Sequence, residues 1–244
     1  MQKIEGIILN ISNYKNSDCV FNILTKDNLI STLGKGSLNI KNKTNRLNNP
    51  FVYGEFDLYE GPTNGYKLRD CKVYDYFSEK FISYEDHMIF NFLNELLFKI
   101  IINSSSYDGY LDIILDTLKQ YGNSSNNYDL VVILFANLLK LNGLCLNTKS
   151  CIVCGDSNEN NLTSIDFING GTVCKHCLNN SLDIMSSKEL QIYKCIFETK
   201  ISDSSKLKLN LDKKMFIKII ENLGLFLSST LDIYLKSLVL LKTI

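Results

Sequence analysis

The first eighty residues of this 244-residue chain alternate between short apolar runs and polar or glycine-containing breaks. Runs of this length, bounded by Gly and polar clusters, are typical of β-strands. In the fourth run the alternation changes phase at Gly54, which predicts a bulge or bend in that strand. Five short strands predict a small barrel of the OB type, and an SH3-like barrel fits the same strand count. The predicted strands are residues 3–12, 19–24, 29–33, 51–59 and 66–77.

After Ser83 the apolar residues recur every three to four positions, which is the period of packed helices. The third helical stretch is apolar on nearly all sides, so we expect it to be central and buried, ending at Gly143. The last stretch is expected to break near Gly224 or at Ser228–Ser229. The predicted helical stretches are residues 87–101, 108–120, 129–141, 187–199 and 213–241.

Two Cys-x-x-Cys pairs separated by nineteen residues interrupt the helical part of the chain. This spacing is typical of structural zinc sites, in which four thiolates close a tetrahedron around the ion. Four protein ligands leave no position for a reactive water, so the predicted Zn²⁺ is structural. A redox dithiol or unligated cysteines are the alternatives. The predicted ligands are Cys151, Cys154, Cys174 and Cys177.

Together these patterns predict an α+β fold, in which a five-stranded OB-type β-barrel precedes an α-helical domain with an inserted four-cysteine zinc finger. We expect the barrel to occupy residues 1–80, the helical domain 81–145 and 183–244, and the zinc-binding insert 146–182.

The remaining candidate groups favour structural roles. We expect the other four cysteines to be thiols of the core, since their neighbours are largely apolar. The two histidines are expected to be surface or helix residues, and a zinc-deaminase pattern is absent. The sequence also lacks a phosphate-binding loop, a dinucleotide fingerprint and a nucleophile elbow. We therefore predict that the protein is not an enzyme. The four cysteines that we expect to be core thiols are Cys19, Cys71, Cys145 and Cys195.

Charge is balanced over the whole chain, with 26 Lys and Arg against 26 Asp and Glu, but it is unevenly distributed. Residues 1–50 carry seven Lys and Arg against three acids, whereas residues 81–185 carry five against eleven. A basic end on a neutral protein is a hint of polyanion binding, although scatter in a Lys-rich surface gives the same imbalance. Residues 34–49 are polar and basic, which predicts a loop between barrel strands.

No secretory signal opens the chain, and its longest strongly apolar stretch, residues 130–139, is too short to span a membrane. We therefore expect a cytoplasmic protein whose cysteines are thiols or metal ligands.

Several stretches, taken in order, resemble the bacterial RecO family of DNA repair and recombination proteins. The resemblance spans nearly the whole chain, and its most specific part is the cysteine pattern. The stretches are GIILNISNYKNSDCVFNILTKDN at 6–28, GKGSLNIKNKTNRLNNPF at 34–51, LNGLCLNTKSCIVCG at 141–155, DFINGGTVCKHC at 166–177 and YLKSLVLLK at 234–242.

The resemblance implies an OB fold that binds single- and double-stranded DNA and promotes annealing of complementary strands. It further implies action with RecR to load a recombinase onto DNA coated by single-strand-binding protein, whose acidic tail the family recognises, in the cytoplasm at the nucleoid. Residues 37–46 are richer in Asn and poorer in Arg than is usual in the family, which predicts weaker or more salt-sensitive binding.

We predict that five basic residues of the barrel contact DNA phosphates, and that Tyr14 either stacks on a base or belongs to the barrel wall. An RNA-binding OB and zinc-ribbon protein of translation or ribosome assembly is the alternative function, and a scaffold that binds no nucleic acid is a third. The predicted DNA-binding residues are Lys15, Lys35, Lys41, Lys43 and Arg46.

Overall fold

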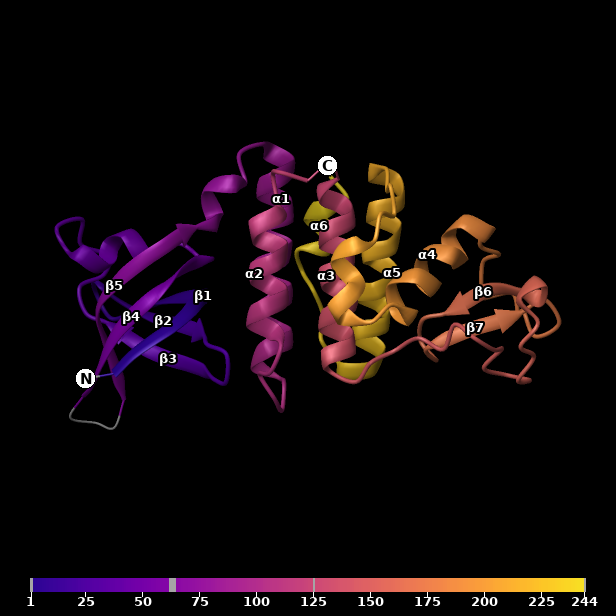
Figure 1. Ribbon diagram of the computed structural model, residues 1–244, viewed down its shortest axis with the longest axis horizontal. Coiled ribbons are helices and arrows are strands. Elements are labelled where there is room, and N and C mark those ends of the chain that lie inside the picture. Colours follow the sequence, from indigo (N-terminus) through magenta and orange to yellow (C-terminus); the bar gives the residue numbers. More distant parts are fainter. Residues whose placement is uncertain (1, 62–64, 125, 244) are drawn as a thin grey trace. The chain divides into compact units, whose positions relative to one another are not determined.

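The computed structural model describes residues 2–61, 65–124 and 126–243. The chain separates into two compact units, Met1–Asn123 and Ser124–Thr243, with Ile244 grouped with the first. Figure 1 labels the elements of both units. The expected three-part division, with a barrel domain at residues 1–80, stays a prediction.

The first unit begins with a closed five-stranded barrel in the order β1-β2-β3-β5-β4, so the predicted OB-type topology is confirmed (Figure 1). Neighbouring strands are antiparallel except β3 and β5, which pair in parallel and close the barrel. The strands are β1 (Gln2–Tyr14), β2 (Asp18–Leu24), β3 (Leu29–Gly34), β4 (Val52–Glu60) and β5 (Tyr66–Tyr76).

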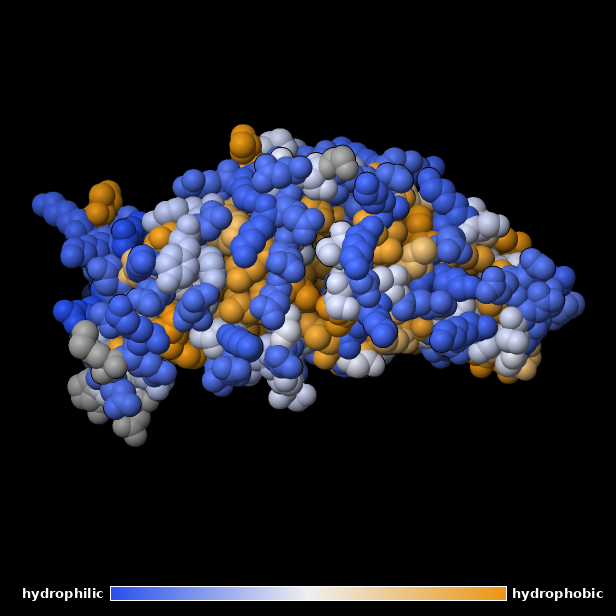
Figure 2. All heavy atoms as spheres, in the orientation of Figure 1, coloured by the Kyte–Doolittle hydropathy of each residue, from blue (hydrophilic) through white to orange (hydrophobic). Residues whose placement is uncertain are grey.

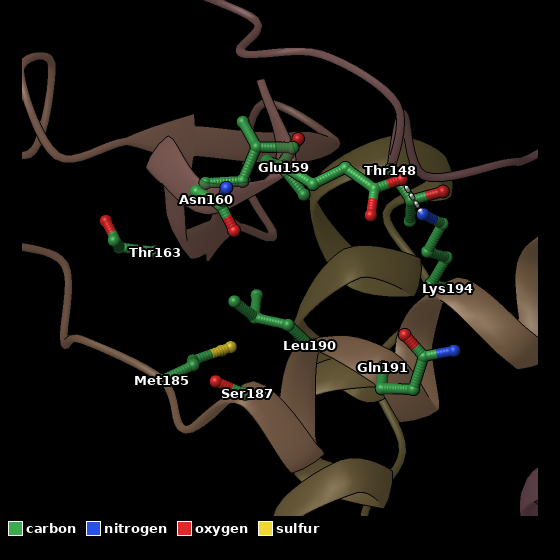
Figure 3. A pocket seen from close by; sticks show the side chains of 11 residues that line it. Thr148, Glu159, Asn160, Thr163, Met185, Ser187, Leu190, Gln191 and Lys194 are labelled. Atoms are coloured by element: carbon green, nitrogen blue, oxygen red, sulfur yellow. Dashed lines mark hydrogen bonds and ion pairs between the residues drawn. The ribbon is translucent and has the colours of Figure 1, made fainter. Parts of the chain in front are cut away.

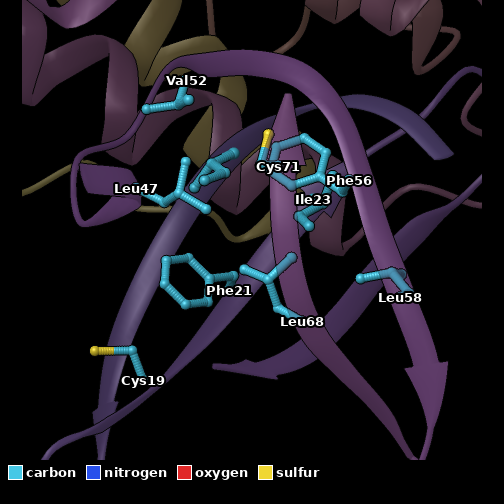
Figure 4. Packing of buried hydrophobic residues seen from close by; sticks show 10 residues of the cluster. Cys19, Phe21, Ile23, Leu47, Val52, Phe56, Leu58, Leu68 and Cys71 are labelled. Carbon is cyan, nitrogen blue, oxygen red and sulfur yellow. The ribbon is translucent and has the colours of Figure 1, made fainter. Parts of the chain in front are cut away.

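Inward-facing side chains fill the barrel, as Figure 4 shows. In β4 the buried positions alternate strictly from Val52 to Leu58, which is the period-two pattern of a strand with one face in a core. The pairing register of β4 with β5 shifts between Tyr53 and Gly54, but the extra residue is Tyr74 of β5, so β4 shows neither the phase change nor the bulge that was predicted for it at Gly54. Phe51 lies outside the strand and does not take part in this alternation.

Two helices follow the barrel in the first unit, α1 (Tyr84–Ile102) and α2 (Tyr110–Gln120), after a short 3-10 helix η2 (Phe77–Lys80). The side chains of Ser83 and Asp86 form a capping box that starts α1. An aromatic cluster joins the end of the barrel to these helices, with Phe81 stacked on Tyr121 at 4.4 Å between ring centroids. Lys80 donates to the carbonyls of Leu118 and Lys119 and thereby satisfies the end of α2.

The second unit is built on α3 (Asn127–Leu141), in which every residue from Val131 to Leu139 is buried, as expected for a central helix. It packs against α4 (Ser187–Glu198) and α5 (Lys213–Leu231). The buried carboxylate of Asp129 accepts backbone N–H bonds from residues 209, 210 and 211, at 2.8, 2.9 and 3.0 Å. These bonds fix the segment that leads into α5.

The end of α5 differs from the prediction. The helix continues through Gly224 and Ser228–Ser229 and stops at Leu231, where Asp232 adopts a left-handed conformation. A Cβ added at Gly224 would lie 2.7 Å from a side-chain carbon of Leu238, so the glycine lets the short helix α6 (Leu238–Leu241) approach α5 rather than breaking α5.

The remaining elements of the second unit are two 3-10 helices, η3 (Glu159–Asn161) and η4 (Ile201–Lys206), and the antiparallel hairpin of β6 (Leu162–Asp166) and β7 (Gly171–Cys174). Among the described residues no helix is both long enough and apolar enough to cross a membrane.

Candidate metal centre and nucleic-acid interface

The four predicted ligands come together in one cluster. Their sulfur atoms all lie within 4.8 Å of one another, and the Sγ atoms of Cys154 and Cys174 are 3.7 Å apart. Cys151 and Cys154 lie on a tight turn closed by a bond from the N–H of Gly155 to the carbonyl of Cys151. Cys174 ends β7, and the N–H of Cys177 bonds back to the Cys174 carbonyl at 3.0 Å.

The cluster fits a tetrahedral metal ion with thiolate ligands. A tetrahedron with Zn–S bonds of about 2.3 Å has S–S edges of about 3.8 Å. The distance between Cys154 and Cys174 matches such an edge, and all eight cysteines of the chain are free thiols rather than disulfides. The four cysteines can therefore hold a metal ion, and their sulfur donors suit zinc.

The environment of the cluster favours the thiolate form of one cysteine, Cys151. Burial works against ionisation of Cys151, but backbone hydrogen bonds from Cys154 and Cys174 outweigh it and lower the pKa of the Cys151 thiol to about 6. A hydrogen bond with Cys154, together with burial, raises the pKa of Cys177 to about 12. The backbone groups that would stabilise a metal-bound thiolate are thus already directed at the sulfur of Cys151.

The cysteine module, residues 146–182, has only a small apolar core of its own, made by Cys151, Leu162, Val173 and Cys174. Asn147 extends the hairpin by bonding to the backbone of residues 170 and 172 at 2.9 and 2.8 Å. A Cβ added at Gly171 would lie 2.4 Å from the side chain of Ile152, so the close approach of these segments requires glycine there.

Two side-chain contacts join the module to α4. Glu159 forms an ion pair with Lys194, and Thr148 donates to Glu198 at 2.7 Å. A pocket of about 370 Å³ lies beside them, between the hairpin and α4 (Figure 3). Leu190 of α4 and Met185 contribute apolar surface to this pocket, and none of the predicted site residues lines it.

The structure brings the predicted basic residues to two neighbouring segments of the barrel. Lys15 lies in the turn between β1 and β2, and the other four belong to the segment that follows β3, residues 35–49, here called the basic loop. The N–H of Leu38 bonds to the carbonyl of Ser17 at 2.9 Å, and the N–H of Gly36 bonds to Asp18 at 2.7 Å, so the two segments are in contact.

Four of these residues are exposed lysines without an ion-pair partner among the residues that the structure describes. The Nζ atom of Lys15 lies 5.4 Å from the ring centroid of Tyr14, which is itself 44% exposed at the end of β1. Tyr14 is therefore placed beside a cation on the surface and not inside the barrel. The four lysines are Lys15, Lys35, Lys41 and Lys43.

Arg46 differs from these lysines because its guanidinium is engaged by β5. It donates to the carbonyl of Cys71 at 2.5 Å and to the carboxylate of Asp70 at 3.2 Å. Its side chain is still 49% exposed. Arg46 therefore ties the basic loop to the barrel while part of the group faces solvent.

The basic loop is ordered by contacts that the sequence pattern did not reveal. Asn45 and Asn48 both donate to the carbonyl of Ser37, at 3.0 and 2.6 Å. Asn42 donates to the carbonyl of Lys35 at 2.7 Å and caps the 3-10 helix η1 (Lys43–Leu47). The spacing of three residues between these asparagines was the available signal. Leu47 then enters the barrel core (Figure 4).

The remaining cysteines divide into two groups. Cys19 and Cys71 are buried in the barrel, as predicted, and burial raises the pKa of Cys71 to about 12. The prediction was wrong for Cys145, which is exposed just after the end of α3, and Cys195 is only half-buried on α4. His87 and His176 are exposed, as expected.

A closed OB-type barrel followed by helices and a four-cysteine cluster that can hold a metal ion defines the class of protein to which this chain belongs. The family model "Recombination protein O C terminal" matches residues 83–238, which is more than half of the chain. The chain therefore belongs to the RecO family of DNA repair and recombination proteins.

Curated relatives agree with this membership. The DNA repair protein RecO of Lactobacillus helveticus (strain DPC 4571) is 24% identical over 178 residues, 71% of this chain and 69% of the relative. That of Clostridium perfringens (strain 13 / Type A) is 26% identical over 176 residues, 70% of each chain. That of Clostridium novyi (strain NT) is 23% identical over 208 residues, 83% of this chain and 79% of the relative.

Proposed function

We propose that this protein binds single- and double-stranded DNA at the end of its barrel, anneals complementary strands, and helps to load a recombinase onto protein-coated single strands. The observation that carries the proposal is the contact between the β1–β2 turn and the basic loop, which gathers four exposed lysines. Membership of a family of DNA repair proteins supports DNA, and not another polyanion, as the ligand.

Electrostatics supplies both binding and annealing in this proposal. Lys15, Lys35, Lys41, Lys43 and the exposed part of Arg46 contact phosphates and release condensed counterions, so affinity falls steeply with salt. Phosphate contacts carry no base information, which gives little sequence preference. Neutralising the phosphates of two strands lowers their mutual repulsion and favours pairing.

The second unit takes the role of partner recruitment in the proposal. Residues 186–244 carry ten lysines against six acids, a charge that suits the acidic tail of single-strand-binding protein. RecR is the second proposed partner, and the protein works without catalysis in the cytoplasm, associated with the nucleoid.

Zn²⁺ is the proposed occupant of the four-cysteine cluster, where it would act as a structural ion. All four ligand positions are filled by protein sulfurs, and the ion would supply the cross-link that the small apolar core of the module lacks.

The proposal is tested by measuring the salt dependence of single-stranded DNA binding for the triple variant Lys35→Ala, Lys41→Ala, Lys43→Ala. The slope of log K against log salt is negative, and each lost phosphate contact reduces its magnitude by about 0.7, so we expect the magnitude to fall by about 2. The matched control replaces three exposed lysines of the second unit, Lys200, Lys208 and Lys214, by Ala. An unchanged slope in the loop variant, or an equal fall in the control, would contradict the assignment.

A further inference from the structure

The tip of the basic loop carries the most exposed of the large apolar side chains that the structure describes. Ile40 is 92% exposed, and the next highest value is 82%, at Ile82. Figure 2 shows an isolated apolar protrusion among hydrophilic atoms at the end of the barrel where this loop lies. The exposed aliphatic surface of Ile40 is available to a ligand, and covering it on binding would be favourable.

Ile40 is presented on a rigid turn and not on a loose strand of chain. The N–H of Asn42 bonds to the carbonyl of Asn39 at 2.9 Å, which places Ile40 and Lys41 at the two central positions of the turn. The N–H of Asn39 in turn bonds to the carbonyl of Gly36 at 3.0 Å.

The base of the turn is fixed as firmly as its tip. Ser37 and Thr44 are buried and joined by a hydrogen bond of 3.2 Å between their hydroxyls. The side-chain amide of Asn42 donates a hydrogen bond to the carbonyl of Lys35. Little conformational entropy is therefore lost when this tip meets a ligand, which is the condition for a side chain to act as a preorganised wedge.

The charges around Ile40 select the ligand. Lys41 is its immediate neighbour, and Lys35 and Lys43 flank the same turn. Proteins that bind the minor groove insert aliphatic side chains between base steps and use basic residues beside them, so an apolar tip with neighbouring lysines suits a ligand with an anionic backbone and an apolar interior. Nucleic acid has this construction, with phosphates outside and stacked bases inside.

We infer that Ile40 inserts between adjacent bases of bound DNA and separates their stack, while the neighbouring lysines hold the phosphates. This inference rests on the proposed DNA-binding function and adds a specific contact to it. Unstacking costs least in single strands and at mismatches, so the wedge favours single-stranded and mispaired DNA over perfect duplex.

The test uses single-stranded DNA with 2-aminopurine at each position in turn, a base whose fluorescence rises when it is unstacked. We expect saturating wild-type protein to raise the fluorescence. Ile40→Ala should lose most of that rise and bind roughly 50-fold more weakly, because it deletes three carbons from a buried contact, with an unchanged salt slope. Ile40→Leu should restore the signal. Ile82→Ala, at the next most exposed isoleucine of the same unit, is the matched control and should behave as wild type.

The outcomes separate the wedge from the function it rests on. Absence of binding by the wild-type protein at low salt would overturn the proposed DNA function itself. Salt-dependent binding without a fluorescence rise, or with a rise that survives in Ile40→Ala, would overturn the wedge alone. An equal loss of the fluorescence rise in Ile82→Ala would also overturn the wedge alone.

Discussion

The basic loop of the barrel and the cysteine module are both polar, irregular segments, yet different interactions order them. The loop sends Leu47 into a large apolar core and is pinned by asparagine amides and Arg46. The module has a small core in which two of the four members are the cysteines themselves. The loop can therefore draw its order from the barrel, whereas we expect the module to depend on a cross-link between its two cysteine pairs.

The largest expected effect is the loss of the module's order when the metal is removed. Metal binding contributes roughly 10 kcal/mol or more to folding in zinc-finger peptides. We expect a chelator, or Cys154→Ser, to make residues 146–182 sensitive to protease while the barrel stays resistant. Mass spectrometry of the cleavage products locates the sites.

The matched control for metal removal is Cys145→Ser, which changes an exposed cysteine outside the cluster and should leave both metal content and protease resistance as in the wild type. If the chelated module resisted protease as well as the untreated protein does, its order would come from its own core and the contrast with the basic loop would be lost.

A smaller but still large effect is expected at the base of the basic loop. Leu47 is fully buried in the barrel core, and Leu47→Ala should lower the free energy of unfolding by about 3 kcal/mol through lost burial and a cavity. Ile40→Ala, seven residues earlier in the same loop, should change it by less than about 0.5 kcal/mol. Denaturant unfolding measures both values.

The same measurement after chelation sharpens the comparison. The Leu47→Ala loss should be the same with and without metal, because Leu47 packs against barrel residues such as Phe21 and Leu68. A loss that disappears with the metal would mean that the two segments do not derive their order independently.

The barrel and the four-cysteine cluster could be predicted from sequence because each leaves a local pattern. The five strands show period-two or continuous apolar runs, and the observed strands begin and end within two residues of the predicted ones. Two Cys-x-x-Cys pairs show ligand spacing without any knowledge of the fold, and the structure brings all four sulfurs together.

The features that sequence reasoning missed depend on contacts between distant residues. Gly224 was read as a helix breaker, but it is where the side chain of Leu238 packs on α5. Arg46 was grouped with the lysines, and its attachment to Asp70 and Cys71 requires the pairing of the loop with β5. Cys145 was judged by its apolar neighbours, although the turn after α3 exposes it.

The smallest expected effect concerns the order that remains in the module when no metal is bound. At the β6–β7 turn, the Asp166 carboxylate accepts the N–H groups of Ile168 and Asn169, both at 3.0 Å, and the Asn169 amide at 2.7 Å. Burial opposes ionisation of this carboxyl, but these hydrogen bonds outweigh it and lower its pKa. This turn is therefore a part of the module that local contacts alone can hold.

A carboxyl whose pKa is lowered in the folded state stabilises that state above its unfolded pKa, and the contribution is lost as the pH falls through the folded value. In the chelated protein we expect the N–H groups of Ile168 and Asn169 to keep partial protection from hydrogen exchange at neutral pH and to lose it below about pH 4. Asp166→Ala should remove this protection at every pH, at a cost of about 1 kcal/mol or less. Protection that vanished with the metal at neutral pH would make the whole module, turn included, dependent on its cysteine cross-link.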